Sequence, residues 1–366
     1  MKSEINKYGQ FFTKKEMCKS ILEIVNNIKP LIGNALEPSF GCGNFIDEIN
    51  NYNLNIDGVE IDKKYFDNYK NIKSNLLNID FLDFETNKQY DFIIGNPPYI
   101  EICYSFYNKE QQDLIKKKYK NICSGRINLV HIFINNSIKL LKDDGIIAFL
   151  LPSSILTSPT YKEIRKLIFE QFSIEYLKED VKFQDVAIKV SLLIIRKNKT
   201  HNKYFYLNND NYFITENYKQ FSNTKTLKEI GFNVSIGEIV WNQHKERLTN
   251  NTDEKMLLYS TNIDVDNLSL INNRDRKQYI INQEVKYNNC IIFPRTISKK
   301  LKYFFVKNNT NYIFENHVLV LTHDDINMLE IFYNNIKNGK YDDTIFSFFN
   351  SSNLTKTEFL SLPFYF

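Results

Sequence analysis

The sequence has little of what marks a metal centre, a disulfide framework or a membrane span. Its cysteines lie far apart, with no Cys-x-x-Cys pair and no histidine at ligand spacing: Cys18, Cys42, Cys103, Cys123 and Cys290. This spacing argues against a zinc site and against disulfides, so we expect no bound metal and reduced cysteines. No apolar run is long enough to cross a bilayer, and the first residues lack the apolar core of a signal peptide. We therefore expect a cytoplasmic protein without a membrane partner.

A large excess of either charge is also absent. The chain has 47 Lys and Arg against 43 Asp and Glu, which gives a formal net charge of +4. This mildly basic balance is compatible with nucleic acid as a partner but does not indicate one by itself. The length of 366 residues predicts two domains.

Apolar runs alternate with helical patterns over the first half of the chain. The expected strands are 35–36, 56–61, 79–82, 90–95, 145–152 and 190–195, and the clearest expected helices are 14–27 and 63–70. Continuous apolar strands that alternate with helices predict an α/β fold whose parallel-type sheet is covered on both faces. Near residues 198–202 the pattern changes to short Tyr/Phe/Ile-rich strands broken by polar turns. We therefore predict a first domain at 1–199 and a mixed α+β domain at 200–366.

The segment 91–100 carries the strongest functional signal, because a buried strand runs into Asn96-Pro97-Pro98-Tyr99. The two prolines make this loop rigid before any substrate arrives. An amine conjugated to a purine ring is a poor nucleophile, but the Asn96 side-chain oxygen and a backbone carbonyl could each accept one of its N–H bonds. The nitrogen lone pair would then point at an electrophilic methyl group. The predicted catalytic residues are Asn96, Pro97 and Tyr99, and Tyr99 would also stack on the base; an ordinary Asn-Pro turn is the alternative.

A second loop, 37–43, follows the first expected strand. Gly41 and Gly43 would allow a tight turn and a close approach of the backbone to a ligand. The third glycine of the dinucleotide fingerprint is replaced by Ile46, so this motif alone also fits a plain strand-to-helix turn.

Acidic residues stand at the ends of the next two expected strands. Glu60 has the position of a carboxylate that accepts hydrogen bonds from ribose hydroxyls. Asp80 could bind the amine of a cofactor adenine, and Phe81 could pack on its ring. These strand ends and the 96–99 loop would share the carboxyl edge of the sheet, where open α/β sheets bind ligands.

With these motifs, residues 8–197 resemble the amino-methyltransferases, in particular the gamma-class, TaqI-like DNA adenine methyltransferases. Segment 8–13 is similar to the N-terminal cofactor motif of that family, although Lys14 stands where a proline usually follows. The segment around Phe183 is similar to the one whose phenylalanine stacks on the flipped base; a core aromatic is the alternative. The resemblance implies a Rossmann-like class I S-adenosylmethionine-dependent domain followed by a target-recognition domain. It implies methyl transfer from S-adenosyl-L-methionine to adenine N6, with the base flipped out because its amine is unreachable in the stack.

The motifs and the resemblance together predict one set of cofactor-binding residues. They are Phe12, Thr13, Glu37, Pro38, Gly41, Gly43, Glu60, Ile61, Asp80, Phe81 and Asn96.

Residues 200–366 are expected to recognise double-stranded DNA. Asn and Gln side chains suit adenine edges in the major groove, and Arg and Lys suit phosphates or guanine. The candidate DNA contacts are Asn242, Gln243, Lys245, Arg274, Arg276, Arg295 and Lys299. For each of them a solvated surface position is the alternative, and the recognition sequence cannot be read from the chain.

Other functions share part of this pattern. Release-factor glutamine methyltransferases use the same catalytic motif, but they carry a helical N-terminal domain and no large C-terminal one. RNA adenine methylation stays open, whereas cytosine N4 methylation typically goes with Ser in place of Asn96. A non-catalytic DNA-binding module is disfavoured by the intact Asn96, Glu60 and Asp80. We expect a monomeric, site-specific methyltransferase of a restriction-modification system or an orphan methylase, which a separate cognate endonuclease could accompany.

Overall fold

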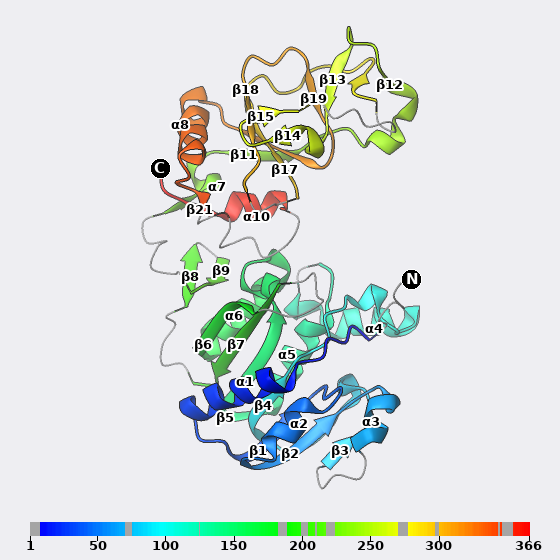
Figure 1. Ribbon diagram of the computed structural model, residues 1–366, viewed down its shortest axis with the longest axis vertical. Helices are drawn as coiled ribbons and strands as arrows, with labels where there is room; N and C mark the ends of the chain where they lie inside the picture. Colours follow the sequence, from blue (N-terminus) through cyan, green and yellow to red (C-terminus); the bar gives the residue numbers. More distant parts are fainter. Residues whose placement is uncertain are drawn as a thin grey trace. The chain divides into compact units, whose positions relative to one another are not determined.

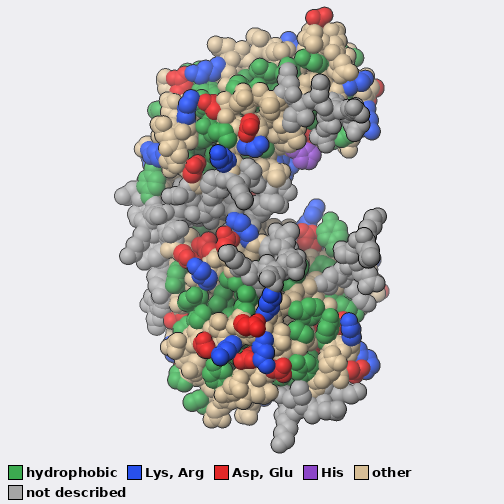
Figure 2. Space-filling model, viewed as in Figure 1, with side chains coloured by type: hydrophobic (Ala, Val, Ile, Leu, Met, Phe, Trp, Pro, Cys, Tyr) green, Lys and Arg blue, Asp and Glu red, His purple; other side chains and the backbone are tan. Residues whose placement is uncertain are grey.

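The computed structural model describes residues 8–69, 75–123, 125–181, 189–198, 204–208, 211–216, 224–269, 277–296, 300–342, 345 and 354–366. The chain divides into two compact units, Met1–Tyr218 and Lys219–Phe366 (Figure 1 and Figure 2). None of the described helices is both long enough and apolar enough to cross a membrane.

The first unit continues beyond residue 199, where the sequence placed the domain boundary, because a hairpin packs back onto it. The hairpin consists of β8 (Phe205–Asn208) and β9 (Asn211–Ile214), and its partner is helix α6 (Lys162–Gln171). The ring centroid of Phe169 on α6 lies 5.1 Å from that of Phe205 and 5.0 Å from that of Tyr212. These aromatic contacts tie the hairpin to the core of the first unit.

The first unit is built on a seven-stranded sheet with the order β3-β2-β1-β4-β5-β7-β6. The strands are β1 (Ile32–Glu37), β2 (Asn53–Val59), β3 (Asn75–Leu77), β4 (Tyr90–Gly95), β5 (Leu141–Pro152), β6 (Ser173–Val181) and β7 (Val190–Arg196). Strand β7 runs antiparallel to both of its neighbours, and the pairs among β1 to β5 are parallel. The apolar runs in β4, β5 and β7 are buried, as expected for strands covered on both faces.

The strand order reverses between β1 and β4, so right-handed crossovers place helices on opposite faces of the sheet. Besides α6 the helices are α1 (Lys15–Ile28), α2 (Asn44–Ile49), α3 (Lys63–Tyr69), α4 (Lys109–Lys118) and α5 (Leu129–Leu140). The crossovers from β1 to β3 run through α2 and α3, and the connection from β4 to β5 runs through α4 and α5. The carboxyl ends of β1 and β4 therefore flank the point at which such sheets bind ligands.

The expected strand at 79–82 is wrong. Strand β3 ends at Leu77, and Phe81–Asp83 forms a 3-10 turn instead. The Asp80 side chain caps this turn by accepting a hydrogen bond from the Leu82 amide at 2.9 Å, a local bond that competes with strand pairing. Asp80 therefore comes shortly after the carboxyl end of β3 and not within a strand.

The second unit consists of short strands and three described helices. Its sheets have the orders β11-β20-β17-β18 and β12-β16-β13-β19, and β14-β15 and β10-β21 form separate pairs. The strands are β10 (Lys225–Thr226), β11 (Asn233–Ile236), β12 (Leu248–Thr249), β13 (Lys255–Leu258), β14 (Ile263–Asp264), β15 (Asn267–Leu268), β16 (Tyr279–Ile280), β17 (Cys290–Pro294), β18 (Phe304–Val306), β19 (Tyr312–Phe314), β20 (Val318–Thr322) and β21 (Pro363–Phe364). The helices are α7 (Leu227–Ile230), α8 (Ile326–Lys337) and α10 (Lys356–Ser361). This is the mixed α+β architecture predicted for the C-terminal half.

Candidate active site

The Asn96 side chain is held in one orientation by residues of the N-terminal segment. Its amide nitrogen Nδ2 donates to the Phe11 carbonyl oxygen at 2.7 Å and to Thr13 Oγ1 at 3.3 Å. A backbone carbonyl can only accept a hydrogen bond, so the amide nitrogen must face Phe11 and the oxygen Oδ1 must face the other way. The site therefore presents an acceptor, not a donor, beside the ligand pocket.

Tyr99 supports the same amide from the other side. Its hydroxyl donates to Asn96 Oδ1 at 2.5 Å, and its ring lies 5.4 Å from that of Phe11. The ring is 9% exposed, because the loop is pulled against the N-terminal segment by a bond from the Tyr99 amide to the Gly9 carbonyl at 3.2 Å. Pro97 is buried and Ser39 Oγ donates to the Asn96 carbonyl at 3.3 Å, so the whole loop is fixed before a substrate binds.

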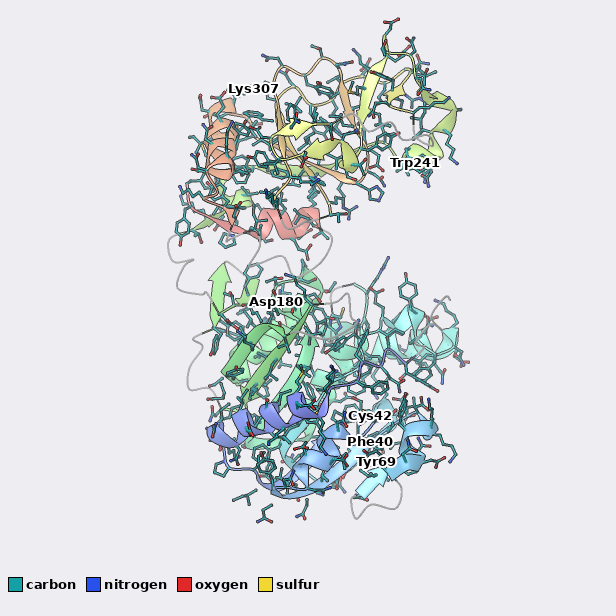
Figure 3. The ribbon with its side chains drawn as sticks, in the orientation of Figure 1. Phe40, Cys42, Tyr69, Asp180, Trp241 and Lys307 are labelled. Atoms are coloured by element: carbon teal, nitrogen blue, oxygen red, sulfur yellow. The ribbon has the colours of Figure 1, made fainter. Side chains whose placement is uncertain are left out.

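The loop after β1 needs both of its glycines. Gly41 and Gly43 have φ values of +52° and +76°, which disfavour other residues. A Cβ atom at position 43 would meet the Tyr69 ring at 2.1 Å, and Figure 3 shows Tyr69 close to Phe40 and Cys42 on this loop. The backbone can therefore turn tightly here.

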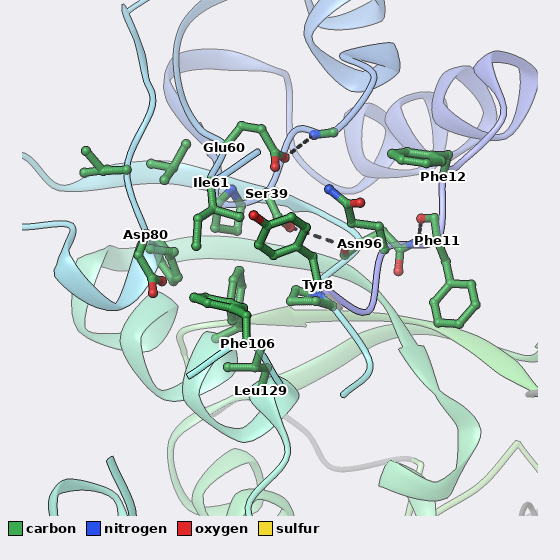
Figure 4. A pocket seen from close by; sticks show the side chains of 18 of the residues that line it. Tyr8, Phe11, Phe12, Ser39, Glu60, Ile61, Asp80, Asn96, Phe106 and Leu129 are labelled. Atoms are coloured by element: carbon green, nitrogen blue, oxygen red, sulfur yellow. Dashed lines mark hydrogen bonds between the residues drawn. The ribbon is translucent and has the colours of Figure 1, made fainter. Parts of the chain in front are cut away.

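A cavity of about 590 Å³ lies along the carboxyl edge of β1, β2 and β4 (Figure 4). The predicted cofactor residues that line it are Phe12, Pro38, Gly41, Glu60, Ile61, Asp80, Phe81 and Asn96. A smaller adjoining cavity of about 270 Å³ is lined by the predicted residues Phe12, Thr13, Glu37, Gly41 and Asn96. Gly43 lines neither cavity and instead shapes the turn.

The charged residues that line these cavities are all acidic: Glu37 and Glu60 are buried, and Asp80 is half-buried. Glu60 accepts from the Gly41 amide at 2.7 Å and from the Asp62 amide at 2.8 Å, yet burial still raises the pKa of its carboxyl. Burial raises the pKa of Asp80 in the same way. The pKa of Glu37 rises well above its usual range, because its carboxyl is fully buried and lies near Glu60 and Asp47. A ligand with positive charge would relieve this desolvation and repulsion.

Aromatic residues that are not among the predicted cofactor-binding residues also line the cavity. Tyr107 donates its hydroxyl to Asp80 Oδ2 at 2.6 Å, and its ring lies 4.2 Å from that of Phe106. Tyr8 packs edge-on against Phe106 at 5.2 Å. The sequence prediction missed Phe106 and Tyr107, for which the only signal is that this aromatic pair precedes the capping box at Asn108.

The comparison with known families matches residues 42–186 to the Eco57I restriction-modification methylase family. The type II methyltransferase M.CvrRI of Paramecium bursaria Chlorella virus XZ-6E is 26% identical over 361 residues, which cover 88% of this chain and 85% of that one. The modification methylase CviBIII of Paramecium bursaria Chlorella virus NC1A is 34% identical over 216 residues. That match covers 56% of this chain and 54% of the relative, so the chain spans only about half the length of some relatives.

Among solved structures, the type IIL restriction-modification enzyme MmeI, in complex with DNA, shares the fold with a TM-score of 0.54. It is 13% identical, and the match covers 87% of this chain and 60% of MmeI. The fold is thus the predicted class I type, and type II methyltransferases are relatives of this chain. The chain is an S-adenosylmethionine-dependent methyltransferase.

The residues of this methyltransferase fit the cofactor. S-adenosylmethionine carries a sulfonium and an ammonium group, and both cavities are lined by buried carboxylates. Oxygen Oε2 of Glu37 is buried and has no hydrogen-bond partner among the described residues, so the ammonium group would donate the hydrogen bond that this oxygen lacks. The aromatic side chains around Asp80 would enclose the adenine ring.

The structure describes only some of the residues that are predicted to contact DNA. Asn242 and Gln243 are exposed on a 3-10 turn, Trp241–Gln243, and Lys245 Nζ lies 5.7 Å from the Trp241 ring centroid. Arg295 is half-buried, with Nε 3.5 Å from the Leu354 carbonyl. Arg274, Arg276 and Lys299 lie outside the described residues, as does Phe183.

Arg295 has an exposed neighbour that the sequence prediction missed. The Arg295 amide donates to the His317 carbonyl at 2.9 Å, and His317 Nδ1 lies 2.7 Å from Oε1 of the buried Glu315. The Glu315 carboxylate fixes the imidazole, and the other nitrogen, Nε2, has no hydrogen bond to the described residues. A lone histidine next to an acid in a turn gave no signal in the sequence.

Proposed function

We propose that this DNA methyltransferase transfers the methyl group of S-adenosyl-L-methionine to N6 of an adenine that is turned out of the duplex. The observation that carries the proposal is the fixed orientation of Asn96, whose oxygen accepts and whose nitrogen is already used by Phe11. An exocyclic amine has N–H bonds to donate, so an acceptor is the group that recognises it. A carboxylate, thiol or imidazole nucleophile is not required.

The chain's own residues would act by positioning the amine. Asn96 Oδ1 would accept one N–H bond and the Pro97 carbonyl the other, which draws the nitrogen lone pair out of the ring system. The bound cofactor supplies the electrophilic methyl group. Tyr99, by its bond to Asn96 Oδ1, keeps the acceptor in place while the charge on the nitrogen develops. We also propose that the Tyr99 ring and Phe183 stack on the flipped adenine.

The second unit, together with the segment from residue 200, is proposed to recognise the DNA sequence. Exposed amide side chains at Asn242 and Gln243 and the basic Lys245 suit base edges and phosphates. The restriction-modification relatives support DNA as the partner. A cognate endonuclease and the monomeric state are further proposals.

The test is single-molecule sequencing of DNA from cells that express the chain or its Asn96→Ala variant. We expect N6-methyladenine at one sequence motif with the wild type. In the variant we expect a loss of methylation rate of at least about 100-fold, as for removal of one preorganised polar group, with cofactor affinity within a small factor. Full activity of the variant would refute the catalytic assignment, and unmodified adenine with the wild type would point to RNA or to a glutamine amide.

A further inference from the structure

A long segment, residues 103–126, which we call the excursion, begins just after the catalytic loop and ends close to its own start. The Ile102 amide donates to the Ile127 carbonyl and the Leu129 amide to the Ile100 carbonyl, each at 2.9 Å. These bonds close the base of the segment 103–126, which contains α4 and two 3-10 turns. The base begins one residue after Tyr99, so the excursion is covalently and spatially tied to the 96–99 loop.

Buried tyrosines at both ends of α4 fix the excursion to the first unit. Tyr107 is 7% exposed and bonds Asp80, and Tyr119 is 4% exposed and bonds Asn136 at 3.1 Å. The start of α4 is held by the capping box of Asn108. The helix therefore has a defined position next to the cofactor cavity, which Tyr107 also lines.

The outer surface of the excursion is basic. Residues 103–126 include six Lys and Arg against one Asp and one Glu, a formal net charge of +4 that equals that of the whole chain. Asp113 forms ion pairs with Lys109 and Lys116, but no described carboxylate pairs with Lys117, Lys118 or Lys120.

The exposed side of α4 combines this charge with an apolar contact. Gln111, Leu114 and Lys118 follow each other at helical spacing and are exposed, Leu114 by 62%. Figure 1 shows α4 at the side of the first unit, away from the core of the sheet. A helix whose outer face is Gln, Leu and Lys suits a polyanion with apolar sugar surface between its charges.

We propose that Lys117, Lys118 and Lys120 form a phosphate-binding surface for duplex DNA on the catalytic unit, in the segment whose base adjoins the catalytic loop. The proposal rests on the proposed function, because it places the DNA backbone next to the base that Asn96 acts on. Lysine ammonium groups contact phosphates without reading sequence, so this surface would hold the duplex whatever the recognition site is. Sequence recognition would stay with the second unit.

The test compares two triple variants with equal loss of charge. One is Lys117→Gln/Lys118→Gln/Lys120→Gln; the control is Lys19→Gln/Lys139→Gln/Lys166→Gln, which changes exposed lysines of α1, α5 and α6. Binding of a fluorescent mixed-sequence duplex of about 30 base pairs is followed at several salt concentrations. We expect roughly 10- to 100-fold weaker binding for the first variant. The slope of log affinity against log salt concentration should become shallower by about 2–3, because each lost phosphate contact reduces that slope by about 0.9.

Each outcome decides the proposal. The control should bind the duplex within about twofold of the wild type, and both variants should keep the cofactor affinity of the wild type, which shows that they are folded. Equal DNA affinities of the two variants would overturn the proposed surface. If the wild type still methylates the DNA in that case, the proposed function stands. A wild type that binds cofactor but neither binds nor methylates the duplex would overturn both.

Discussion

The two units of the chain position their functional side chains by different means. In the first unit, Glu37, Glu60 and Asn96 stand at or directly after the ends of parallel strands, so the sheet itself sets their spacing. In the second unit most strands are two to five residues long, and side chains hold the turns between them. Asn309, for example, donates to the carbonyls of Tyr287 and Tyr312, each at 2.9 Å. The proposed chemistry is thus built on rigid elements, and the proposed recognition surface is built on turns that can change without altering the core.

The largest expected effect concerns the packing of the second unit. A Cβ atom at Gly237 would lie 2.1 Å from the Glu315 carbonyl oxygen, so Gly237→Ala must move backbone. We expect a loss of roughly 3 kcal/mol in the stability of this unit and loss of DNA binding, with unchanged cofactor affinity. Gly339→Ala is the control, because its Cβ meets nothing closer than 3.6 Å and only its φ of +70° opposes the change. Normal DNA binding by Gly237→Ala, or a comparable loss in Gly339→Ala, would contradict the packing argument.

A smaller effect is expected in the cofactor site of the first unit. Glu37→Gln removes the charge that would meet the cofactor ammonium group, and we expect about 10-fold weaker binding of S-adenosylmethionine at neutral pH. Burial raises the pKa of Glu37 above its usual value near 4.5, so the wild-type affinity should fall as the pH drops through that raised pKa. Calorimetry in buffers of different ionisation enthalpy should also detect proton release on binding. The same pH profile in the variant would show that another group is responsible.

The raised pKa of Glu37 has the opposite effect on the stability of the cofactor-free protein. Because the folded state binds the proton more tightly than the unfolded state, the stability contribution is fully present below about pH 4.5 and is lost as the pH rises through the folded pKa. Glu37→Gln should therefore flatten the dependence of cofactor-free stability on pH in this range. Urea unfolding at several pH values measures this difference.

The smallest expected effect is on the urea transition followed by the fluorescence of Trp241. Trp241 is the single tryptophan of the chain and lies in the second unit (Figure 3). Saturating S-adenosylmethionine should stabilise the first unit by about 2.7 kcal/mol at 100 times its Kd. The urea transition followed by tryptophan fluorescence should stay in place, while that followed by circular dichroism moves. Equal shifts of both signals would show that the two units unfold together.

The sequence predicted those parts of the site that follow strands. Loops after β1 and β4 and the acid after β2 were located from apolar runs and glycine and proline positions, because strand ends share one edge of a parallel sheet. The bonds from Tyr107 to Asp80 and from Asn96 to Phe11 were not predicted, because their partners lie 27 and 85 positions apart in the chain. No local pattern encodes such contacts.

For the second unit, the sequence predicts only the mixed α+β fold class. Its strands are too short to give a period, and residues such as Asn309 and Glu315 read as polar surface although both are buried. The 3-10 turn at Phe81–Asp83 shows the same difficulty in the first unit, because a side-chain cap replaced the strand that the apolar residues indicated.

The bond from Asn96 to the Phe11 carbonyl makes the proposed catalytic loop, residues 96–99, depend on a segment 85 positions earlier in the chain. A graft of residues 96–99 onto another sheet would carry the prolines and the tyrosine but not the carbonyl that orients the amide. Its oxygen and nitrogen would then be free to exchange places, and the site would present a donor as often as an acceptor. The transferable part is the loop together with the strap at residues 9–13, which engineering or recombination would have to move as one piece.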